Sequence, residues 1–393
     1  MKVPVSGAVR TAQERLNLID VAETGWYTSG KYTAQFERGL REFIGVRHAI
    51  FCNSGSSANL LAVMALTAQE HGERRLMAGD EVITVAAGFP TTINPIIQAG
   101  AIPVFVDVTI PEYNTTVEML DRALSFKTKA VILAHTLGRP YDVKAVKAWC
   151  EANRLWLIED CCDALGSEVD GRKVGSFGDI STLSFFPAHN ITTGEGGAVL
   201  TDNGLLAKII HSYRDWGRDC WCQPGADNTC GRRFDFPYDH KYSYSRIGYN
   251  LKATEMQAAI GVAQLAELPA WNLRRVRNFG LLEEGLRKWG AFFILPHYTD
   301  GMIPFGFPIL PKCGRRDLVD FLERAGIVTR PLFAGNIIKH KSMEGVNWRK
   351  VGDLHNSDMV YDRAFWIGCW HGLTDDHMQY VVDKFREYVI DEL

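Results

Sequence analysis

The sequence predicts an α/β protein with a mostly parallel sheet, joined to a smaller α+β domain at the C-terminal end. Three observations support this prediction. Short apolar runs alternate with amphipathic stretches from residue 49 to residue 160, and such β-α repetition is typical of a parallel sheet covered by helices. The chain has 393 residues, a length that suggests two or three domains, and its 46% hydrophobic content can fill a large core. After residue 252 the alternation gives way to helical stretches with isolated short strands.

The expected elements follow in order along the chain. Residues 11–45 predict a helix, a turn and a second amphipathic helix that pack on the main domain. Strands of the large domain are expected at residues 49–52, 81–87, 102–108, 130–135 and 155–160. Elements of the smaller domain are expected at residues 272–290 (helix), 292–295 and 305–310 (strands) and 375–393 (helix). The predicted division is a large domain at residues 1–252, with a loop inserted at about 215–245, and a smaller domain at residues 253–393.

Charge and cysteine content exclude several classes of protein. The formal net charge is -3, and no run of Lys or Arg is interleaved with aromatic residues, so neither nucleic acid nor an acidic membrane is an expected partner. No stretch of about 18 apolar residues or secretion signal is present, which favours a cytoplasmic location. The nine cysteines do not form a disulfide framework, and a reducing compartment would keep them available for a metal.

The segment at residues 181–201 is the centre of the predicted site. It reads STLSFFPAHNITTGEGGAVLT, in which an apolar strand leads to a turn at Pro187, a Thr/Gly-rich loop and a second short strand. A side chain at the end of such a strand can project into a cleft, and His189 occupies that place. The alternative for a lone histidine is a structural role in the core.

Three further candidates follow strands of the large domain. The small residues at 53–58 open a helix, where backbone N–H groups and serine hydroxyls can bind an anion, although a serine-rich N-cap has the same appearance. Phe89 follows the next strand and is either a ring-stacking residue or part of the core. Asp160 ends the last predicted strand and could place a carboxylate at the same edge of the sheet.

The inserted loop carries a cysteine pattern. Cys220, Cys222 and Cys230 form C-x-C-x7-C, and Cys162 precedes Cys220 by 57 intervening residues. Four thiolates of this kind can bind zinc or an iron–sulfur cluster. The paired C-x2-C knuckles of a zinc ribbon are absent from the sequence.

The segment SFFPAHNITTGEGG resembles the DegT/StrS family of pyridoxal-phosphate sugar aminotransferases, which read S-F-x-x-x-K-x-x-x-x-G-E-G-G with lysine as the Schiff-base residue. The resemblance covers essentially the whole chain. It implies a fold-type-I (aspartate aminotransferase-like) large domain with a mostly parallel sheet, plus a smaller α+β C-terminal domain. His189 stands at the lysine position, and imidazole cannot form the imine that a primary amine forms.

The resemblance also implies a role for each cofactor-binding residue. The serine-rich loop would bind the phosphate together with Ser184, an aromatic ring would stack on the pyridine, and a carboxylate would face the pyridine nitrogen. The implied cofactor-binding residues are Gly55, Ser56, Ser57, Phe89, Asp160, Asp163, Ser184 and Asn250. Asp163 would lie near the ring hydroxyl. Asn250, in the segment Gly-Tyr-Asn, would reach the phosphate of a neighbouring subunit, which implies a homodimer with shared active sites.

The cysteine pattern and the histidine together resemble one branch of the family, the iron–sulfur, pyridoxamine-phosphate-dependent CDP-4-keto-6-deoxyglucose 3-dehydrases. The stretches VITVAAGFPTTINP, IEDCCDALGS and DWGRDCWC are similar to that branch. Phe186, in place of tyrosine, and Asn190, in place of a second histidine, depart from it. The branch implies pyridoxamine 5'-phosphate and a [2Fe-2S] cluster as cofactors. The implied metal ligands are Cys162, Cys220, Cys222 and Cys230.

The function implied by this resemblance is C3 dehydration, or deoxygenation, of a nucleotide-linked 4-keto-6-deoxyhexose (CDP or dTDP) in dideoxysugar and lipopolysaccharide biosynthesis. His189, whose ordinary pKa is about 6.5, would act as the base. A separate NAD(P)H-dependent flavin/iron–sulfur reductase would supply electrons. Two alternatives remain: a cluster-free 3-dehydratase that uses pyridoxal phosphate and glutamate, and a non-enzymatic iron–sulfur or zinc protein on a dead aminotransferase scaffold.

Overall fold

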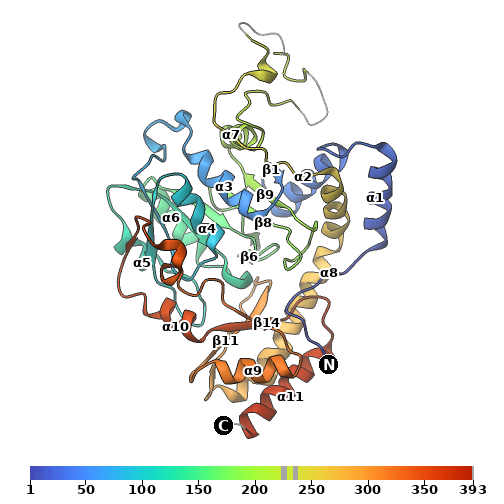
Figure 1. Ribbon diagram of the computed structural model, residues 1–393, viewed down its shortest axis with the longest axis vertical. Coiled ribbons are helices and arrows are strands. Elements are labelled where there is room, and N and C mark those ends of the chain that lie inside the picture. The colour runs from blue at the N-terminus through green and yellow to red at the C-terminus, as the bar shows by residue number, and fades with distance from the viewer. Residues whose placement is uncertain (223–227, 233–237, 392–393) are drawn as a thin grey trace.

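A large sheet forms the centre of the computed structural model, which describes residues 1–222, 228–232 and 238–391 (Figure 1). Within these residues the sheet has eight strands in the order β1-β9-β8-β5-β4-β2-β3-β13. In that order the strands are β1 (His48–Cys52), β9 (Gly197–Thr201), β8 (Ile180–Ser184), β5 (Trp156–Asp160), β4 (Thr128–Ala134), β2 (Glu81–Val85), β3 (Ile102–Val106) and β13 (Arg349–Lys350). β9 runs antiparallel to β1 and to β8, and the remaining pairs are parallel. The predicted mostly parallel sheet is confirmed.

Helices bury both faces of this sheet. They are α3 (Gly55–Leu66), α4 (Pro90–Gln98), α5 (Val117–Ala123), α6 (Val143–Ala152) and α7 (Gly204–Arg214). Successive strand residues point to opposite faces, so Val131 joins the apolar cluster that includes α5 and α6, whereas Ile132 joins the cluster that includes α3 and α7. Because both faces are apolar, polar side chains collect at the strand ends, where the site lies.

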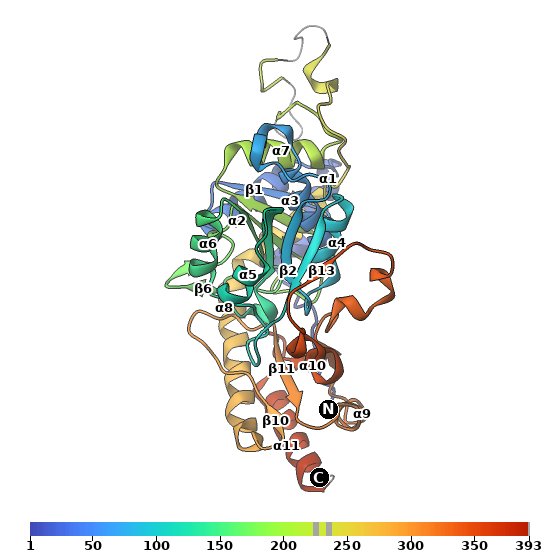
Figure 2. The same ribbon diagram turned by 90° about the vertical axis from the view of Figure 1, so that its left-hand side faces the viewer.

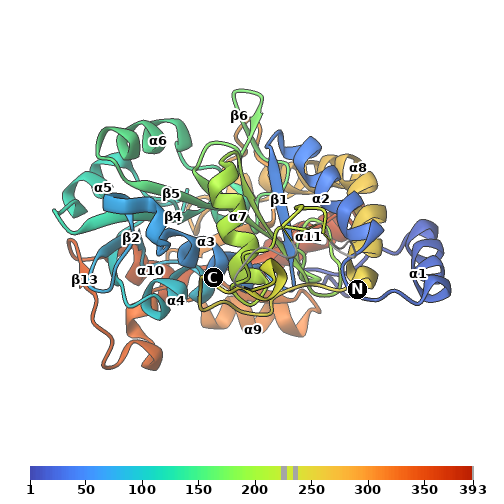
Figure 3. The ribbon, with the colours of Figure 1, turned by 90° about the horizontal axis from the view of Figure 1, so that it is seen from above.

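The N-terminal helices pack beside the sheet, as predicted. α1 (Ala12–Thr24) and α2 (Lys31–Ile44) contact the long helix α8 (Glu255–Leu286) at one side of the molecule (Figure 3). α2 has no side-chain cap of its own. Instead Glu255 accepts hydrogen bonds from the backbone N–H groups of Tyr32 and Thr33, at 2.9 and 2.7 Å. A carboxylate at this end also complements the helix dipole, so the first turn of α8 stabilises α2.

The C-terminal part has a sheet of its own. In the described residues its four strands are antiparallel, in the order β10 (Phe293–Ile294), β11 (Gly306–Pro311), β14 (Phe365–Gly368) and β12 (Thr329–Pro331). The neighbouring helices are α9 (Arg316–Arg324), α10 (His355–Arg363) and α11 (Asp375–Asp391). β13 leaves this part and pairs in parallel with β3 of the large sheet. α8 is one continuous helix that runs from the large part into the C-terminal part (Figure 1).

The inserted loop projects from one end of the molecule, and the C-terminal part forms the other end (Figure 2). Bridges between Asp215 and Asn250 and between Arg218 and Tyr244 close the base of the loop. Two minor strands, β6 (Glu168–Val169) and β7 (Arg172–Lys173), form a separate hairpin. The short 3-10 helices span Gln69–Arg74, Thr136–Gly138, His240–Tyr242, Arg287–Trp289, Ile337–Lys339 and Lys341–Met343. None of the helices in the described part of the chain has an apolar run that could span a lipid bilayer.

Candidate active site and cysteine cluster

Asp160 is a buried carboxylate at the carboxyl end of β5. Its Oδ2 atom accepts hydrogen bonds from Asn59 Nδ2 at 2.9 Å and from Thr92 Oγ1 at 2.7 Å. Its Oδ1 atom accepts one from the backbone N–H of Cys162 at 3.1 Å. Asn59 is held in turn by Thr182 of β8, whose hydroxyl donates to Asn59 Oδ1 at 2.6 Å. Three donors therefore fix the orientation of this carboxylate, as expected of a group that faces a cationic ring nitrogen.

His189 lies in a tight turn that follows β8. The turn is closed by a hydrogen bond from the backbone N–H of His189 to the carbonyl of Phe186, at 2.9 Å. Arg275 of α8 donates to the carbonyl of His189 at 3.1 Å, and the same guanidinium donates to the carbonyl of Phe305 at 3.1 Å. The imidazole ring lies 5.3 Å from the ring of Phe305, centroid to centroid. The base candidate is thus held by the large sheet, by α8 and by the segment that leads into β11.

The imidazole is neutral in this environment. Burial lowers the pKa of His189 to about 4, and the charge of Asp160 only partly opposes that shift. The Nδ1 atom has no hydrogen-bond partner among the described residues, and it lies 3.7 Å from Asp163 Oδ1. A neutral imidazole can accept a proton from a bound molecule.

Asp163 is the second titratable group of this pair. Burial, and then the charge of Asp160, raise the pKa of Asp163 to about 8. Its Oδ2 atom accepts a hydrogen bond from the backbone N–H of Leu137 at 3.3 Å. Near pH 7 the carboxyl group of Asp163 is therefore protonated, and the imidazole of His189 is neutral.

The first turn of α3 is packed tightly against the end of β8. Ser54 caps the helix, with its Oγ atom accepting from the backbone N–H of Ser57 at 3.1 Å. A Cβ atom added to Gly55 would lie 2.5 Å from Ser184 Cβ. Ser56 is exposed and Ser57 is half-buried at this helix end. Backbone N–H groups and hydroxyls from two elements thus meet at one helix N-terminus, which fits a phosphate.

Phe89 and Asn250 border this region without belonging to the core. Phe89 directly precedes α4, and its side chain is 49% exposed, which excludes the alternative of a core residue. It contacts the ring of Phe333 edge to face, with centroids 6.0 Å apart. Asn250 is exposed, and its Oδ1 atom accepts from Lys252 Nζ at 2.7 Å. Because the neighbouring Leu251 accepts from the backbone N–H of Asn53, Asn250 lies beside the chain that leads into α3.

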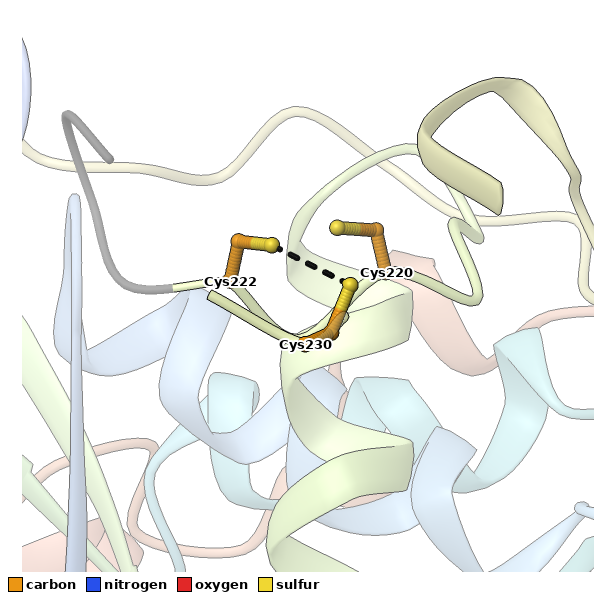
Figure 4. Close-up of side chains that lie close together, drawn as sticks. All are labelled: Cys220, Cys222 and Cys230. Carbon is orange, nitrogen blue, oxygen red and sulfur yellow. Dashed lines mark hydrogen bonds between the residues drawn. The ribbon is translucent and has the colours of Figure 1, made fainter. Parts of the chain in front are cut away.

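The three cysteines of the loop come together (Figure 4). The sulfurs of Cys220, Cys222 and Cys230 all lie within 4.8 Å of one another, and those of Cys222 and Cys230 are 3.4 Å apart. Burial raises the pKa of Cys222, but hydrogen bonds from Thr229 and from the other two cysteines lower this pKa to about 6. A thiolate at this position is ready to bind a metal.

Cys162 is not part of this group among the described residues. It follows β5, and its backbone N–H binds Asp160. The structure therefore brings together three of the four predicted metal ligands, and a ligand role for Cys162 remains a prediction. A cavity of about 650 Å³ opens beside Cys220 and Cys222.

The sequence analysis missed the polar residues that hold the predicted ones. Asn59, Thr92 and Thr182 fix Asp160, and Arg275 fixes the turn of His189. In the sequence, one feature could have identified Asn59 as a site residue: it is an amide on the otherwise apolar face of a helix that begins with serines. Polar residues at such positions are buried only when they have partners, and the partners come from distant parts of the chain.

Comparison with solved structures identifies the class. The fold matches GDP-4-keto-6-deoxymannose-3-dehydratase with bound GDP-perosamine, with a TM-score of 0.90 and 26% identity over 98% of this chain and 100% of that chain. It also matches the E. coli GDP-4-keto-6-deoxy-D-mannose-3-dehydratase with bound hydrated pyridoxal phosphate, with a TM-score of 0.89 and 26% identity over 98% of this chain and 99% of that chain. The fold and the site therefore define a protein of the pyridoxal-phosphate-dependent aminotransferase fold, as predicted.

Residues 9–386 match the DegT/DnrJ/EryC1/StrS aminotransferase family, and the chain belongs to this family. One relative is a lipopolysaccharide biosynthesis protein, RfbH, of Salmonella typhimurium, which is 52% identical over 98% of this chain and 91% of that protein. Another is the dTDP-4-dehydro-2,6-dideoxy-D-glucose 3-dehydratase of Saccharopolyspora spinosa, 47% identical over 98% of this chain and 86% of that protein. The predicted family is confirmed.

Proposed function

We propose that this chain catalyses C3 dehydration of a nucleotide-linked 4-keto-6-deoxyhexose with pyridoxamine phosphate and a [2Fe-2S] cluster, leading to a 3-deoxy sugar. One observation carries the proposal: a neutral imidazole, His189, stands where the family has its Schiff-base lysine. The relatives named as 3-dehydratases support the same reaction. RfbH, a lipopolysaccharide biosynthesis protein, supports a place in lipopolysaccharide biosynthesis.

The residues of the site fit the phosphorylated pyridine cofactor. The close packing of Gly55 against Ser184 and the exposed Ser56 suit the phosphate of the cofactor. Asp160, which accepts three hydrogen bonds, suits the ring nitrogen. In this proposal Phe89, which is exposed beside α4, stacks on the ring. When bound, the cofactor supplies a primary amine for the C4 ketone of the sugar and a ring that accepts electrons.

The chain's own side chains move the protons. His189, with Nδ1 at 3.7 Å from Asp163 Oδ1, takes a proton from the bound substrate and returns it. Because its carboxyl group is protonated near pH 7, Asp163 adds no charge beside the ring.

Replacing the C3 hydroxyl by hydrogen requires two electrons as well as the loss of water. The cysteine cluster suits an iron–sulfur centre, which transfers single electrons. The donor we propose is a separate NAD(P)H-dependent flavin/iron–sulfur reductase. The exposed Asn250, close to the phosphate end of α3, supports a homodimer in which each subunit completes the site of the other.

Isotope exchange and borohydride trapping test the role of His189. With substrate and pyridoxamine phosphate, the wild-type chain should exchange a cofactor hydrogen with deuterated solvent, and His189→Asn should lose this exchange while still binding the cofactor. Borohydride should attach pyridoxal phosphate covalently to His189→Lys but not to wild type. His297→Asn, at a position where the side chain is 74% exposed, is the control and should behave as wild type. Covalent trapping in wild type, or exchange that survives in His189→Asn, contradicts the proposal.

The cluster-free alternative also has an observation in its favour. The fold matches a GDP-4-keto-6-deoxymannose-3-dehydratase that holds a pyridoxal-phosphate–glutamate geminal diamine, with a TM-score of 0.89. If this chain works in the same way, glutamate should sustain turnover without iron or a reductase. If the proposal is correct, the protein purified without oxygen should contain iron and sulfide, and glutamate should not replace the reductase.

A further inference from the structure

A cavity lies beside β1, the strand at one edge of the large sheet. Among the described strands β1 pairs only with β9, and both α2 and α7 contact it (Figure 3). The base of the inserted loop, from Asp215 to Cys222, forms one wall of the cavity. The volume of about 650 Å³ is within the range of about 300–1,000 Å³ that is typical of small-molecule sites. The cavity is therefore large enough for a ligand of its own.

The lining of this cavity is strongly positive. It contains six arginine and lysine side chains but only two carboxylates, those of Glu37 and Asp215, an excess of four positive charges. The six side chains are Arg38, Arg41, Arg214, Arg218, Lys241 and Lys252. The chain as a whole has a net charge of -3, so positive charge is concentrated at this place. A concave surface with charges of one sign attracts ions of the other sign.

The two carboxylates of the lining are already engaged by Arg214. The Nε atom of Arg214 lies 2.8 Å from Asp215 Oδ1, and its Nη1 atom lies 3.5 Å from Glu37 Oε1. Arg214 is buried and also donates to the carbonyl of Phe51 at 2.8 Å. Within the described part of the chain no carboxylate forms an ion pair with the three other arginines of the lining. These arginines therefore remain available to an anion.

Two groups in the wall are in an environment that lacks negative charge. Burial, and then the charges of Arg214 and Arg218, lower the pKa of Lys252 to about 8, although Asp215 opposes this shift. The Nε atom of Arg218 is buried and has no hydrogen-bond partner among the described residues. Buried polar atoms in native structures usually have a partner. A bound anion would supply both the missing acceptor and the missing negative charge.

Exposed indole rings hold the cations at the wall. Trp26, Trp216 and Trp221 line the cavity, and all three are exposed. Lys252 Nζ lies 3.3 Å from the ring centre of Trp216, and the guanidinium carbon of Arg218 lies 4.4 Å from it. Such cation–π contacts restrict two otherwise flexible side chains. Less conformational entropy is then lost when these side chains bind a ligand.

We propose that this cavity binds an oligophosphate, either free or as the diphosphate of a nucleotide. The guanidinium groups of Arg38, Arg41 and Arg218 match phosphate oxygens in bidentate geometry. A ligand with several negative charges fits an excess of four positive charges better than a single carboxylate does. None of the described lining residues belongs to α3. The site is therefore separate from the one proposed for the cofactor phosphate, and its ligand does not depend on the reaction proposed above.

Calorimetric titration of the full chain tests the site. The protein is first saturated with pyridoxamine phosphate, so that the cofactor site is filled, and is then titrated with pyrophosphate. We expect pyrophosphate to bind, and Arg38→Ser combined with Arg41→Ser to weaken this binding by about tenfold or more, because charge-assisted contacts to phosphate are lost. Arg316→Ser is the matched control. This side chain on α9 is 92% exposed and does not line the cavity, so the affinity should equal that of wild type.

A nucleoside diphosphate in the same titration distinguishes the two sources of the ligand. Only the binding that the double variant loses is counted, because the substrate site can also bind a nucleotide. Tighter binding than that of pyrophosphate assigns a nucleotide to the cavity. Equal or weaker binding assigns a free oligophosphate.

Chemical modification of the wild-type chain needs no variant, so it remains decisive even if a variant fails to fold. Phenylglyoxal should modify Arg38 and Arg41, as identified by peptide mass spectrometry, and pyrophosphate should protect both of them but not Arg316. The proposal is overturned if pyrophosphate does not bind, if it binds the double variant as tightly as wild type, or if it protects neither arginine. It is also overturned if both arginines are unreactive without pyrophosphate and light scattering shows that the double variant loses its dimer. The cavity would then be a contact between two copies of the chain.

Discussion

Replacing Gly55 by alanine should weaken cofactor binding by a definite amount. The added methyl group would lie 2.5 Å from Ser184 Cβ and 2.7 Å from Ser184 Oγ. Carbon atoms in contact are about 3.5 to 4.0 Å apart, so α3 and the end of β8 must separate by about 1 Å. This separation moves the helix N–H groups away from the hydroxyl of Ser184, and we propose that both bind the cofactor phosphate.

The size of the effect follows from the cost of overpacking, about 1–3 kcal/mol. If this cost falls on the state that binds phosphate, the affinity for pyridoxamine phosphate drops about 5- to 150-fold. Calorimetric titration of the cofactor-free protein measures it. Gly280→Ala on α8 is the matched control, because a methyl group there meets no atom within 4 Å; its affinity should equal that of wild type.

A second substitution, at Ser184, tests whether the steric contact causes this loss of affinity. Ser184→Gly removes the two atoms that the new methyl group would strike, so Gly55→Ala should cost less affinity in the Ser184→Gly background than in wild type. The two changes should therefore be non-additive by more than about 0.5 kcal/mol. Additive effects, or wild-type affinity in Gly55→Ala, would refute the close contact of α3 with β8 as the reason for this glycine.

Two further predictions concern stability. Burial raises the pKa of Asp163 to about 8. From about pH 4 to pH 8 this carboxyl group is therefore deprotonated in the unfolded chain but still protonated in the folded chain. The free energy of unfolding should fall as pH rises through this window. Asp163→Asn should remove this part of the pH dependence in urea unfolding of the cofactor-free protein, and an unchanged slope would contradict the shift. Phe36 is fully buried, with its ring 5.1 Å from each of the rings of Phe51 and Phe185. Phe36→Ala should cost about 3–5 kcal/mol in the same assay, and a loss below about 1 kcal/mol would contradict the packing.

Local periodicity was sufficient to predict most strands of the large sheet and, in the C-terminal part, β10, β11 and α11. Strands β2, β3, β4 and β5 are buried apolar runs, and their order along the chain is clear from the helices between them. β12 and β14 are short and pair across distant parts of the chain, so no local pattern predicts them. β13 is a two-residue strand that joins the large sheet from the C-terminal part. α8 continues through Pro269, because packing on both sides of the helix outweighs one lost backbone hydrogen bond.

The site was predictable where residues end strands and unpredictable where they meet across the fold. Asp160 and His189 follow apolar strands, and the comparison with a family pattern was enough to find them. The contact of Asp163 with His189 and the contact of Cys230 with His240 depend on how two turns fold back. Spacing along the sequence carries no information about such contacts.

The double attachment of Arg275 makes the molecule mechanically stiff at its centre. This side chain is buried, and it binds the turn of His189 and the carbonyl of Phe305 together. Hydrogen bonds to a charged group contribute about 1.5–3 kcal/mol each, so rotation of the C-terminal part about α8 would break bonds that also hold the turn of His189. A hinge motion between the two parts of the chain would therefore move this turn as well. Mutations in the C-terminal part should leave the turn undisturbed only where they keep the axis of α8 in place.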